Sequence, residues 1–416
     1  MILKQLHLTT LLLQVLLAFG QSEKGYPDVQ EYNAKIILDL VNRSIEGNVT
    51  IDFRISSEET QVYFDCGNLE VSSVRGDHVK SFRQENSQLI IEFSNQSSGR
   101  LQVSIEYSGS PKRGLIFKED LAYTVFSTDQ WMVCNMDPSD RAQLTLEIAA
   151  ADTLNLITSN SYEAPAYTYG FAVGSFDKFS EVSDGTTLTY YSNQYSEKQL
   201  AKIFRETPRI LAFLEEKSGV PYYQDSYSQI LAGDHYQEMA GFAMIKSSYG
   251  DHVLSDSTET NLITHELAHQ WWGNQITCQN WNHFWLNEAF ATYLSAAYNE
   301  ERFGKEKYKS DIDSYFQVYK KVKDRGVDKP LVFDDWSNPS RDDRNIVYFK
   351  GAFVLHLLRE EIGDEAFWKG LKHYSQENFG KSVTTSVFQK AMEKASSKSL
   401  DSFFIKWVYG STDPDK

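Results

Sequence analysis

Two histidines lie four residues apart in the chain, and a glutamate directly follows the first of them. They are His265 and His269, with Glu266, in the segment THELAHQWWGN. Residues four apart share one face of an α-helix, so both imidazoles can reach one tetrahedral Zn²⁺. Glu266 then borders the metal without binding it, a position that suits a general base acting on metal-bound water. The spacing therefore predicts a hydrolytic zinc site.

A third metal ligand is expected from a second helix. Glu288 lies nineteen residues after His269, in the segment WLNEAF. Two histidines and one carboxylate leave one of the four zinc positions open, which is typical of a catalytic site and not of a structural one. We therefore predict one Zn²⁺ per chain, bound by His265, His269 and Glu288. The alternative, a surface helix with two unrelated histidines, does not account for Glu288.

The elements that must position these residues follow from a change of hydrophobic period. Up to about residue 185, apolar and polar residues alternate, as in the segment 49–55, which indicates β-strands. From about residue 187 onward the period is helical. The sequence thus predicts an α+β protein, with a β-rich domain over residues 21–185 and a mainly helical catalytic domain over residues 186–416.

Seven helical stretches are predicted in the second domain. The one that carries the histidines is expected to begin with a capping box formed by Asp256-Ser257-Thr258-Glu259. The predicted stretches cover residues 196–217, 257–272, 286–303, 347–362, 364–379, 385–395 and 400–409.

The first twenty residues have the pattern of an export signal. Lys4 precedes an apolar run over residues 8–19, and the small residues Ala18 and Gly20 flank a cleavage site. This predicts a signal peptide over residues 1–20 and a secreted or periplasmic protein; an uncleaved N-terminal tail is the alternative. The run is too short to span a membrane.

Charge and cysteine content exclude other classes of protein. The formal net charge is −16 and no basic run occurs, so we expect peptides and not nucleic acid as partners. Cys66, Cys134 and Cys278 are too few and too scattered for a disulfide scaffold or a cysteine-based metal site. One bridge between Cys66 and Cys134 and three buried free thiols both remain compatible with the sequence. Asn42, Asn48 and Asn95 each begin an N-x-S/T sequon, which is glycosylated only where the source has that machinery.

The segments HELAHQWWGN and WLNEAFATY resemble the motifs of the gluzincin zinc aminopeptidases, the family of aminopeptidase N and leukotriene hydrolase. The resemblance extends over nearly the whole chain. Residues 131–142 are similar to the N-domain signature of the family, and residues 403–410 to the end of its catalytic domain. It implies a β saddle packed on a thermolysin-like domain, in a short form without the helical C-terminal domain of larger relatives.

The resemblance also implies roles for residues outside the zinc motif. Tyr348, in a Y-x-K-G context sixty residues after Glu288, corresponds to a catalytic tyrosine that hydrogen-bonds the forming oxyanion. Glu238 and Gly241 correspond to a G-x-M-E-N strand, in which the glutamate holds the substrate amine and the backbone pairs with an extended peptide. Two features depart from the family pattern. The asparagine of that strand is missing and its glycine has moved. Ser295 replaces a glutamate seven residues after the metal ligand, so the surroundings of the ligands must differ.

The predicted function is zinc-dependent hydrolysis of the N-terminal residue from peptides, with Glu266 as general base. Three alternatives stay open. A zinc endopeptidase would suit the altered G-x-M-E-N strand, and a non-peptidase zinc hydrolase would use the same metal site. A non-catalytic scaffold on this fold is disfavoured by the intact HExxH motif.

Overall fold

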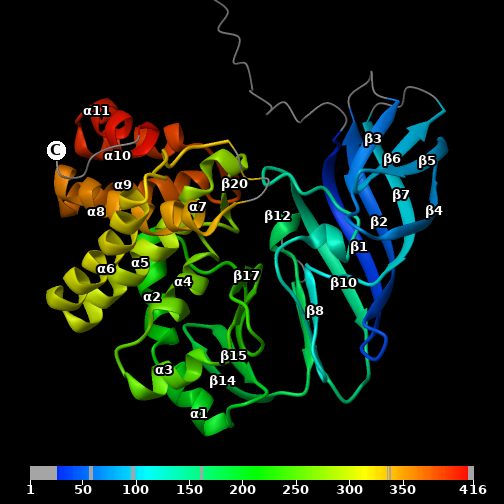
Figure 1. The fold of residues 1–416 in the computed structure, drawn as a ribbon, viewed down its shortest axis with the longest axis horizontal. Coiled ribbons are helices and arrows are strands. Elements are labelled where there is room, and N and C mark those ends of the chain that lie inside the picture. The colour runs from blue at the N-terminus through cyan, green and yellow to red at the C-terminus, as the bar shows by residue number, and fades with distance from the viewer. Residues whose placement is uncertain are drawn as a thin grey trace, which may run out of the picture.

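The computed structural model describes residues 26–55, 60–94, 99–159, 163–334, 336 and 339–410. The predicted signal peptide and the sequon at Asn95 lie outside the described residues. Figure 1 shows two lobes side by side, one built of strands from the first part of the chain and one built mainly of helices from the second part. This arrangement confirms the predicted α+β class, with the β-rich part first.

The first lobe consists of three antiparallel or mixed sheets. A six-stranded sheet has the order β12-β10-β1-β2-β7-β4, a four-stranded sheet the order β11-β13-β9-β8, and a three-stranded sheet the order β3-β6-β5. Val49, Ile51 and Phe53 of β2 are fully buried, as the predicted alternation requires. The strands are β1 (Asp28–Asp39), β2 (Ser44–Ile55), β3 (Gln61–Asp65), β4 (Glu70–Gly76), β5 (Val79–Glu85), β6 (Gln88–Phe93), β7 (Gly99–Gly109), β8 (Leu115–Phe117), β9 (Leu121–Thr124), β10 (Arg141–Ala149), β11 (Asn155–Thr158), β12 (Glu163–Pro165) and β13 (Phe171–Gly174).

The second lobe begins with a five-stranded sheet of order β14-β15-β16-β18-β17. Its strands are β14 (Asp177–Ser183), β15 (Thr186–Ser192), β16 (Ser226–Leu231), β17 (Gln237–Met239) and β18 (Phe242–Ile245). The predicted domain boundary after residue 185 falls in the turn of the β14–β15 hairpin, and both strands of this hairpin belong to the sheet. The strand β17, which carries Glu238, runs antiparallel to β18 at the edge of the sheet.

The helices of the second lobe surround α5, in which every residue from Trp285 to Asn299 is buried. A helix that is buried on all sides forms the centre of a domain, and α5 carries Glu288. The helices are α1 (Glu197–Ile203), α2 (Thr207–Ser218), α3 (Tyr249–Ser255), α4 (Asn261–Ala268), α5 (Trp285–Phe303), α6 (Lys305–Asp324), α7 (Arg341–Asn345), α8 (Gly351–Ile362), α9 (Asp364–Asn378), α10 (Thr385–Ser396) and α11 (Asp401–Phe404). Two π-helical turns, η4 (Ile346–Lys350) and η5 (Ile405–Tyr409), precede α8 and follow α11, and β19 (Ile276–Cys278) pairs with β20 (Lys381–Val383).

Three details of the helix prediction were wrong. The predicted helix 196–217 is two helices, because the chain turns between α1 and α2 and a proline stands in the first turn of α2. The predicted capping box does not start α4. The carboxylate of Asp256 instead accepts hydrogen bonds from the backbone and the hydroxyl of Thr258, and the helix begins at Asn261. The helices α3, α6 and α7 were not predicted, although the buried Tyr308, Ile312 and Tyr315 of α6 have helical spacing.

Two observations bear on the predicted class of protein. All three cysteines are buried and free, so the alternative of a Cys66–Cys134 bridge is not realised. No helix in the described part of the chain is long and apolar enough to cross a membrane.

Candidate metal centre and active site

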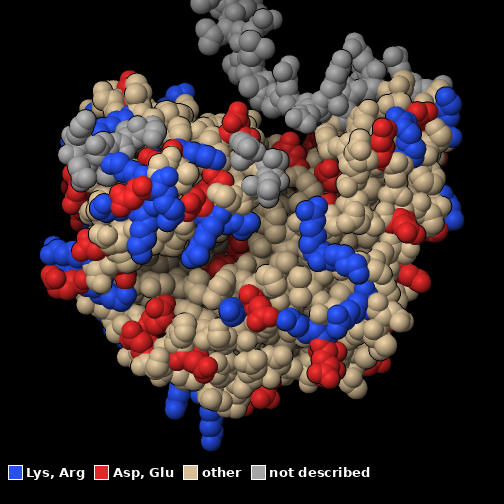
Figure 2. All heavy atoms as spheres, in the orientation of Figure 1, with Lys and Arg blue, Asp and Glu red and all other residues tan. Residues whose placement is uncertain are grey.

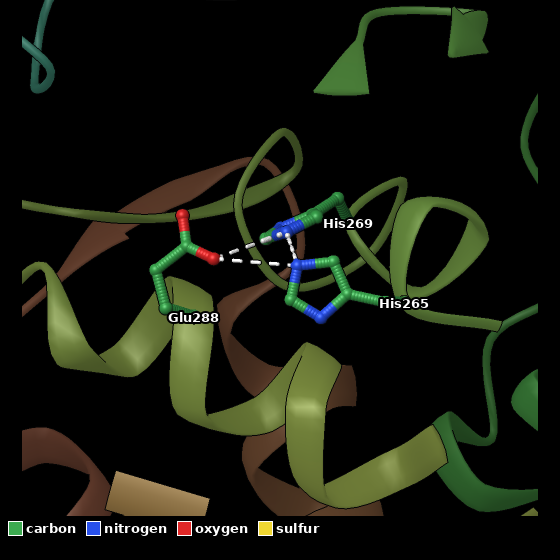
Figure 3. A group of neighbouring side chains, drawn as sticks. All are labelled: His265, His269 and Glu288. Carbon is green, nitrogen blue, oxygen red and sulfur yellow. Dashed lines mark hydrogen bonds and ion pairs between the residues drawn. The ribbon is translucent and has the colours of Figure 1, made fainter. Parts of the chain in front are cut away.

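The packing of α4 against α5 brings the three predicted metal ligands together. The Nε2 atoms of His265 and His269 lie 3.1 Å apart, and each lies 3.4 Å from the same carboxylate oxygen of Glu288. Figure 3 shows the two rings and the carboxylate directed at one common point. His269 and Glu288 are each only 1% exposed, so the point lies at the buried end of the site.

This donor set fits a zinc ion. A tetrahedron with metal–ligand bonds of about 2.0–2.1 Å has edges of about 3.3–3.4 Å, close to the three distances between the donor atoms. The oxygen of Glu288 that faces the histidines is buried and accepts no hydrogen bond from the described residues. A buried carboxylate oxygen without a donor requires a positive partner, and a cation held by all three side chains supplies it.

The charges around the site also favour a cation. Burial and the neighbouring carboxylate of Glu238 raise the pKa of Glu266 well above its usual range. Burial alone would lower the pKa of His269, but the charges of Glu288 and Glu238 outweigh it and raise that pKa. The three glutamates thus attract positive charge to the place where the imidazoles meet. A dication bound by these residues would take the place of a proton on His269 and would lower the pKa of the neighbouring carboxyl groups.

Hydrogen bonds on the outer side of the rings fix their orientation. Nδ1 of His269 lies 3.0 Å from the carbonyl oxygen of Trp272, which can only accept, so Nδ1 carries the proton and Nε2 is free to bind a metal. Nδ1 of His265 lies 3.4 Å from the hydroxyl of Thr292. A Cβ atom at Gly273 would lie 2.8 Å from Nδ1 of His269, so the turn after this ligand requires a glycine.

Thr292 is a site residue that the sequence did not reveal. The departure from the family pattern lies at Ser295, but the Ser295 hydroxyl donates to the backbone oxygens of Asn261 and Ala291. Thr292 instead contacts His265. It follows Glu288 by four residues and so lies on the same face of α5, which is a signal that the sequence did contain.

Tyr348 lies beside the metal ligands. Its ring stacks on the ring of His265, with centroids 5.6 Å apart and an angle of 11° between the planes. Burial and the charge of Glu288 raise the pKa of Tyr348 well above its usual range, so its hydroxyl stays protonated and can donate. The turn η4 that carries it is anchored by Lys350, which is fully buried and bonds Asp328 at 2.8 Å and the Lys329 carbonyl at 2.6 Å.

The edge strand β17 is tied to the zinc-binding segment by one glutamine. The side chain of Gln270 accepts from the backbone N–H of Gly241 at 3.0 Å and donates to the carbonyl of Met239 at 2.9 Å. Asn274 donates to the same carbonyl at 3.2 Å. Gln270 and Asn274, which follow His269 in the chain, therefore fix the position of β17 and of its residue Glu238 relative to the metal site.

Gly241 has a different place from the one its predicted role requires. It has φ of +87° in the turn between β17 and β18, where a side chain would be strained. Its N–H bonds Gln270 and its carbonyl accepts from Ser228, so neither backbone group is free for a substrate. The structure gives Gly241 a role in the turn that holds Glu238, not a direct contact with a peptide.

One cavity of about 660 Å³ joins the remaining predicted residues. Glu238, His265, Glu266 and Tyr348 all line it. Residues that the sequence analysis did not single out line it as well, among them Tyr315 from the unpredicted helix α6 and two arginines of α7. A cavity of this size with convergent charged groups is typical of a small-ligand or short-peptide site.

The first lobe also supports the site. The guanidinium of Arg141 donates to the carbonyl of Asn274 at 2.8 Å and to the side chain of Gln275 at 3.1 Å. The hydroxyl of Tyr167 donates to the carbonyl of Gly273 at 2.9 Å. Both contacts hold the turn that follows His269, which gives the predicted N-domain signature around Arg141 a physical role.

Residues 203–407 match the family model described as the Peptidase family M1 domain. Aminopeptidase N of Lactobacillus delbrueckii subsp. lactis is 25% identical over 443 residues, which cover 93% of this chain and 51% of that protein. Aminopeptidase N of Lactococcus lactis subsp. lactis is 34% identical over 165 residues, which cover 35% of this chain and 18% of that protein. The chain spans about half the length of the curated relatives that it matches throughout.

Solved structures share the fold. The crystal structure of an M1 zinc metallopeptidase from Deinococcus radiodurans superposes with a TM-score of 0.76 at 21% sequence identity, over 94% of this chain and 95% of that one. A two-domain M1 zinc metallopeptidase bound to L-tryptophan gives a TM-score of 0.78 at 21% identity. The family and the donor set imply one catalytic zinc ion. The motifs at His265 and Glu288, the two-lobed fold and these matches together show that residues 203–407 of the chain form a peptidase family M1 domain, similar to that of the aminopeptidase N type of gluzincins.

Proposed function

We propose that this protein is a zinc-dependent aminopeptidase that removes the N-terminal residue from peptides. The observation that carries the proposal is the joint lining of one cavity by an amine-binding carboxylate, a general base and a hydroxyl donor. These are Glu238, Glu266 and Tyr348, and His265 of the metal site lines the same cavity. The relatives named aminopeptidase N support the same reaction.

Each side chain has one task in the reaction. When bound by His265, His269 and Glu288, zinc supplies a Lewis acid that polarises a carbonyl and makes a water molecule more acidic. Glu266 takes a proton from the attacking water and returns it to the leaving amine. Tyr348 donates a hydrogen bond to the carbonyl oxygen as negative charge develops on it.

Glu238 supports exopeptidase rather than endopeptidase action. It lies on the edge strand β17 and lines the cavity together with Glu266. Its carboxylate accepts a hydrogen bond from the side chain of Gln237 at 2.9 Å, which holds it at this edge of the cavity. A charge-assisted bond to a substrate ammonium would set the cut one residue from the N-terminus.

The test compares aminoacyl-anilides with their N-acetylated forms, with and without a chelator. We expect hydrolysis of the free-amine substrates, its loss on chelation and its return when zinc is added. Acetylation removes the positive charge, so acetylated substrates should react poorly. Glu238→Gln should reduce the ratio of kcat/KM for the free-amine substrate to kcat/KM for the acetylated one. Glu119→Gln, at an exposed residue, should leave that ratio unchanged.

The same comparison, made on free and N-acetylated peptides with the products identified by mass spectrometry, separates the alternatives. Equal kcat/KM for free and acetylated substrates, with cuts at internal bonds, would make the protein a zinc endopeptidase. No cleavage of any peptide or anilide by protein that holds one zinc per chain would contradict the proposed peptidase activity.

A further inference from the structure

Two arginines line the same cavity as the catalytic carboxylates. Arg341 and Arg344 belong to the short helix α7, and both are exposed. They stand in a chain with a net charge of −16. Figure 2 shows basic side chains at the place of α7, beside a hollow in the middle of the face with acidic atoms inside it. The cavity therefore has an acidic part, formed by β17 and α4, and a basic part formed by α7.

The acidic neighbours of these arginines are engaged with other residues. Asp342 pairs with Arg325. Asp343 pairs with Lys329 at 2.6 Å and accepts hydrogen bonds from Ser340. These contacts attach α7 to the chain that follows α6. Within the described ranges, no carboxylate is paired with Arg341 or Arg344, so both guanidinium groups are available to a ligand in the cavity.

The position of Arg344 along the chain relates it to the reaction centre. It precedes Tyr348 by four residues, and α7 runs directly into the turn η4 that carries Tyr348. Residues about one turn apart lie on the same side of a helix. In the proposed reaction Tyr348 lies at the carbonyl of the bond that is cut, and Glu238 lies at the N-terminal amine of the substrate. A group beside Tyr348 but on a different element from Glu238 is in reach of the part of the substrate that follows the cut.

We propose that Arg344, with Arg341, binds a carboxylate of the substrate on the C-terminal side of the cleaved bond. This proposal rests on the proposed aminopeptidase function and names its substrate class. A guanidinium presents a planar pair of donors that matches a carboxylate, so the interaction is directional as well as ionic. The carboxylate is either the C-terminus of a di- or tripeptide or the side chain of an aspartate or glutamate.

The test measures kcat/KM for matched peptides that differ only in charge. One pair is a tripeptide with a free C-terminus and the same tripeptide as its C-terminal amide. The second pair is an amidated hexapeptide with aspartate or asparagine at the second position. We expect the charged member of at least one pair to be favoured about tenfold, as for a hydrogen bond to a charged group. A preference in the first pair assigns the carboxylate to the C-terminus, and a preference in the second assigns it to a side chain.

Variants connect the preference to α7. In Arg344→Gln the charged-to-neutral ratio should fall toward one, and in Arg341→Gln it should fall less. Lys309→Gln is the matched control, because it removes one positive charge from an exposed residue of α6 that pairs with Glu306. Its ratio should equal that of the wild type. The ratio is measured within each variant, so a general loss of folded protein does not change it.

Failure of this proposal differs from failure of the proposed function. Alanyl-anilide has no carboxylate and needs only the amine anchor and the metal site. If the wild type cleaves it but treats both members of each peptide pair alike, the carboxylate subsite is wrong and the aminopeptidase stands. A preference that survives in the Arg341→Gln/Arg344→Gln double variant also overturns the subsite. If the zinc-loaded wild type cleaves neither this anilide nor any of the peptides, the proposed function itself fails.

Discussion

The two ends of the catalytic cavity are built in opposite ways. At the metal end, His269 and Glu288 are each only 1% exposed and belong to elements packed into the core, and a hydrogen bond to the carbonyl of Trp272 sets the orientation of the His269 ring. At the other end, Arg341 and Arg344 are exposed on a five-residue helix that is held by ion pairs near the surface. Metal binding needs donors placed within a few tenths of an ångström, whereas recognition of a charge in water tolerates a looser frame.

The largest effect is expected at the metal end. His269→Ala removes one of three protein ligands, so we expect loss of stoichiometric zinc and of all measurable activity together. Elemental analysis of the purified variant, with circular dichroism to confirm folding, provides the measurement. One zinc per chain in folded His269→Ala protein would show that the metal is bound elsewhere. The buried end of the cavity would then not be the metal site.

A substitution one residue from a ligand should separate chemistry from metal binding. Glu266→Gln keeps the shape of the side chain and removes its basicity, so zinc content should stay at one per chain while kcat falls by about 10²–10⁴. Steady-state kinetics on an anilide, together with metal analysis, gives both numbers. A kcat close to that of the wild type would assign the general base to a different group.

The next prediction concerns the stability of the turn η4, which lies between α7 and the metal site and ends at Lys350. Lys350 is fully buried, and its partner Asp328 is 7% exposed. Lys350→Met removes one member of this buried ion pair, which should lower the free energy of unfolding by about 3–5 kcal/mol. Denaturant unfolding measures the loss. The double variant Lys350→Met/Asp328→Asn removes both charges and should recover part of that stability.

The same substitution tests how Tyr348 is positioned. Lys350 ends the turn η4, so its loss should lower kcat through displacement of Tyr348, although Lys350 itself lies outside the cavity lining. Zinc content should stay at one per chain. An unchanged kcat in folded Lys350→Met protein would mean that the stacking of Tyr348 on His265 is sufficient to hold the hydroxyl in place.

The contrast between the ends also explains what could be read from the sequence. The order of β-rich and helical parts follows from periodicity, and the pairing of His265 with His269 follows from spacing along one helix, which are local properties. Glu288 was predicted from its place nineteen residues after His269, at the start of a second helix. The exposed α7 has no apolar face that hydrophobic periodicity could detect. The helix α6 was not predicted because charged residues dominate its sequence, although its buried tyrosines are regularly spaced. Gly241 was placed on the substrate strand by resemblance, but its hydrogen bond to Gln270 depends on the distance between β17 and α4 in space, which no local pattern contains.

The smallest effect is expected where α7 is attached. Hydrogen bonds from Lys329 and Ser340 outweigh the effect of burial and lower the pKa of Asp343, and the Ser340–Asp343 pair forms a capping box at the start of the helix. Lys329 is 41% exposed, so solvent screens its charge, and Asp343→Asn should lower the free energy of unfolding by only about 1 kcal/mol at neutral pH.

The pH dependence of that loss follows from the direction of the shift. A carboxyl whose pKa is lower in the folded protein stabilises the fold at every pH above its unfolded value of about 3.9. The contribution disappears as the pH falls through the folded pKa, because the folded and unfolded forms are then both protonated. The stability difference between wild type and Asp343→Asn should therefore be constant from pH 6 to 8 and shrink below about pH 4. A difference that grows in acid would mean that burial, and not the Lys329 and Ser340 contacts, dominates at Asp343, and α7 would then be anchored more like the metal end than its exposure indicates.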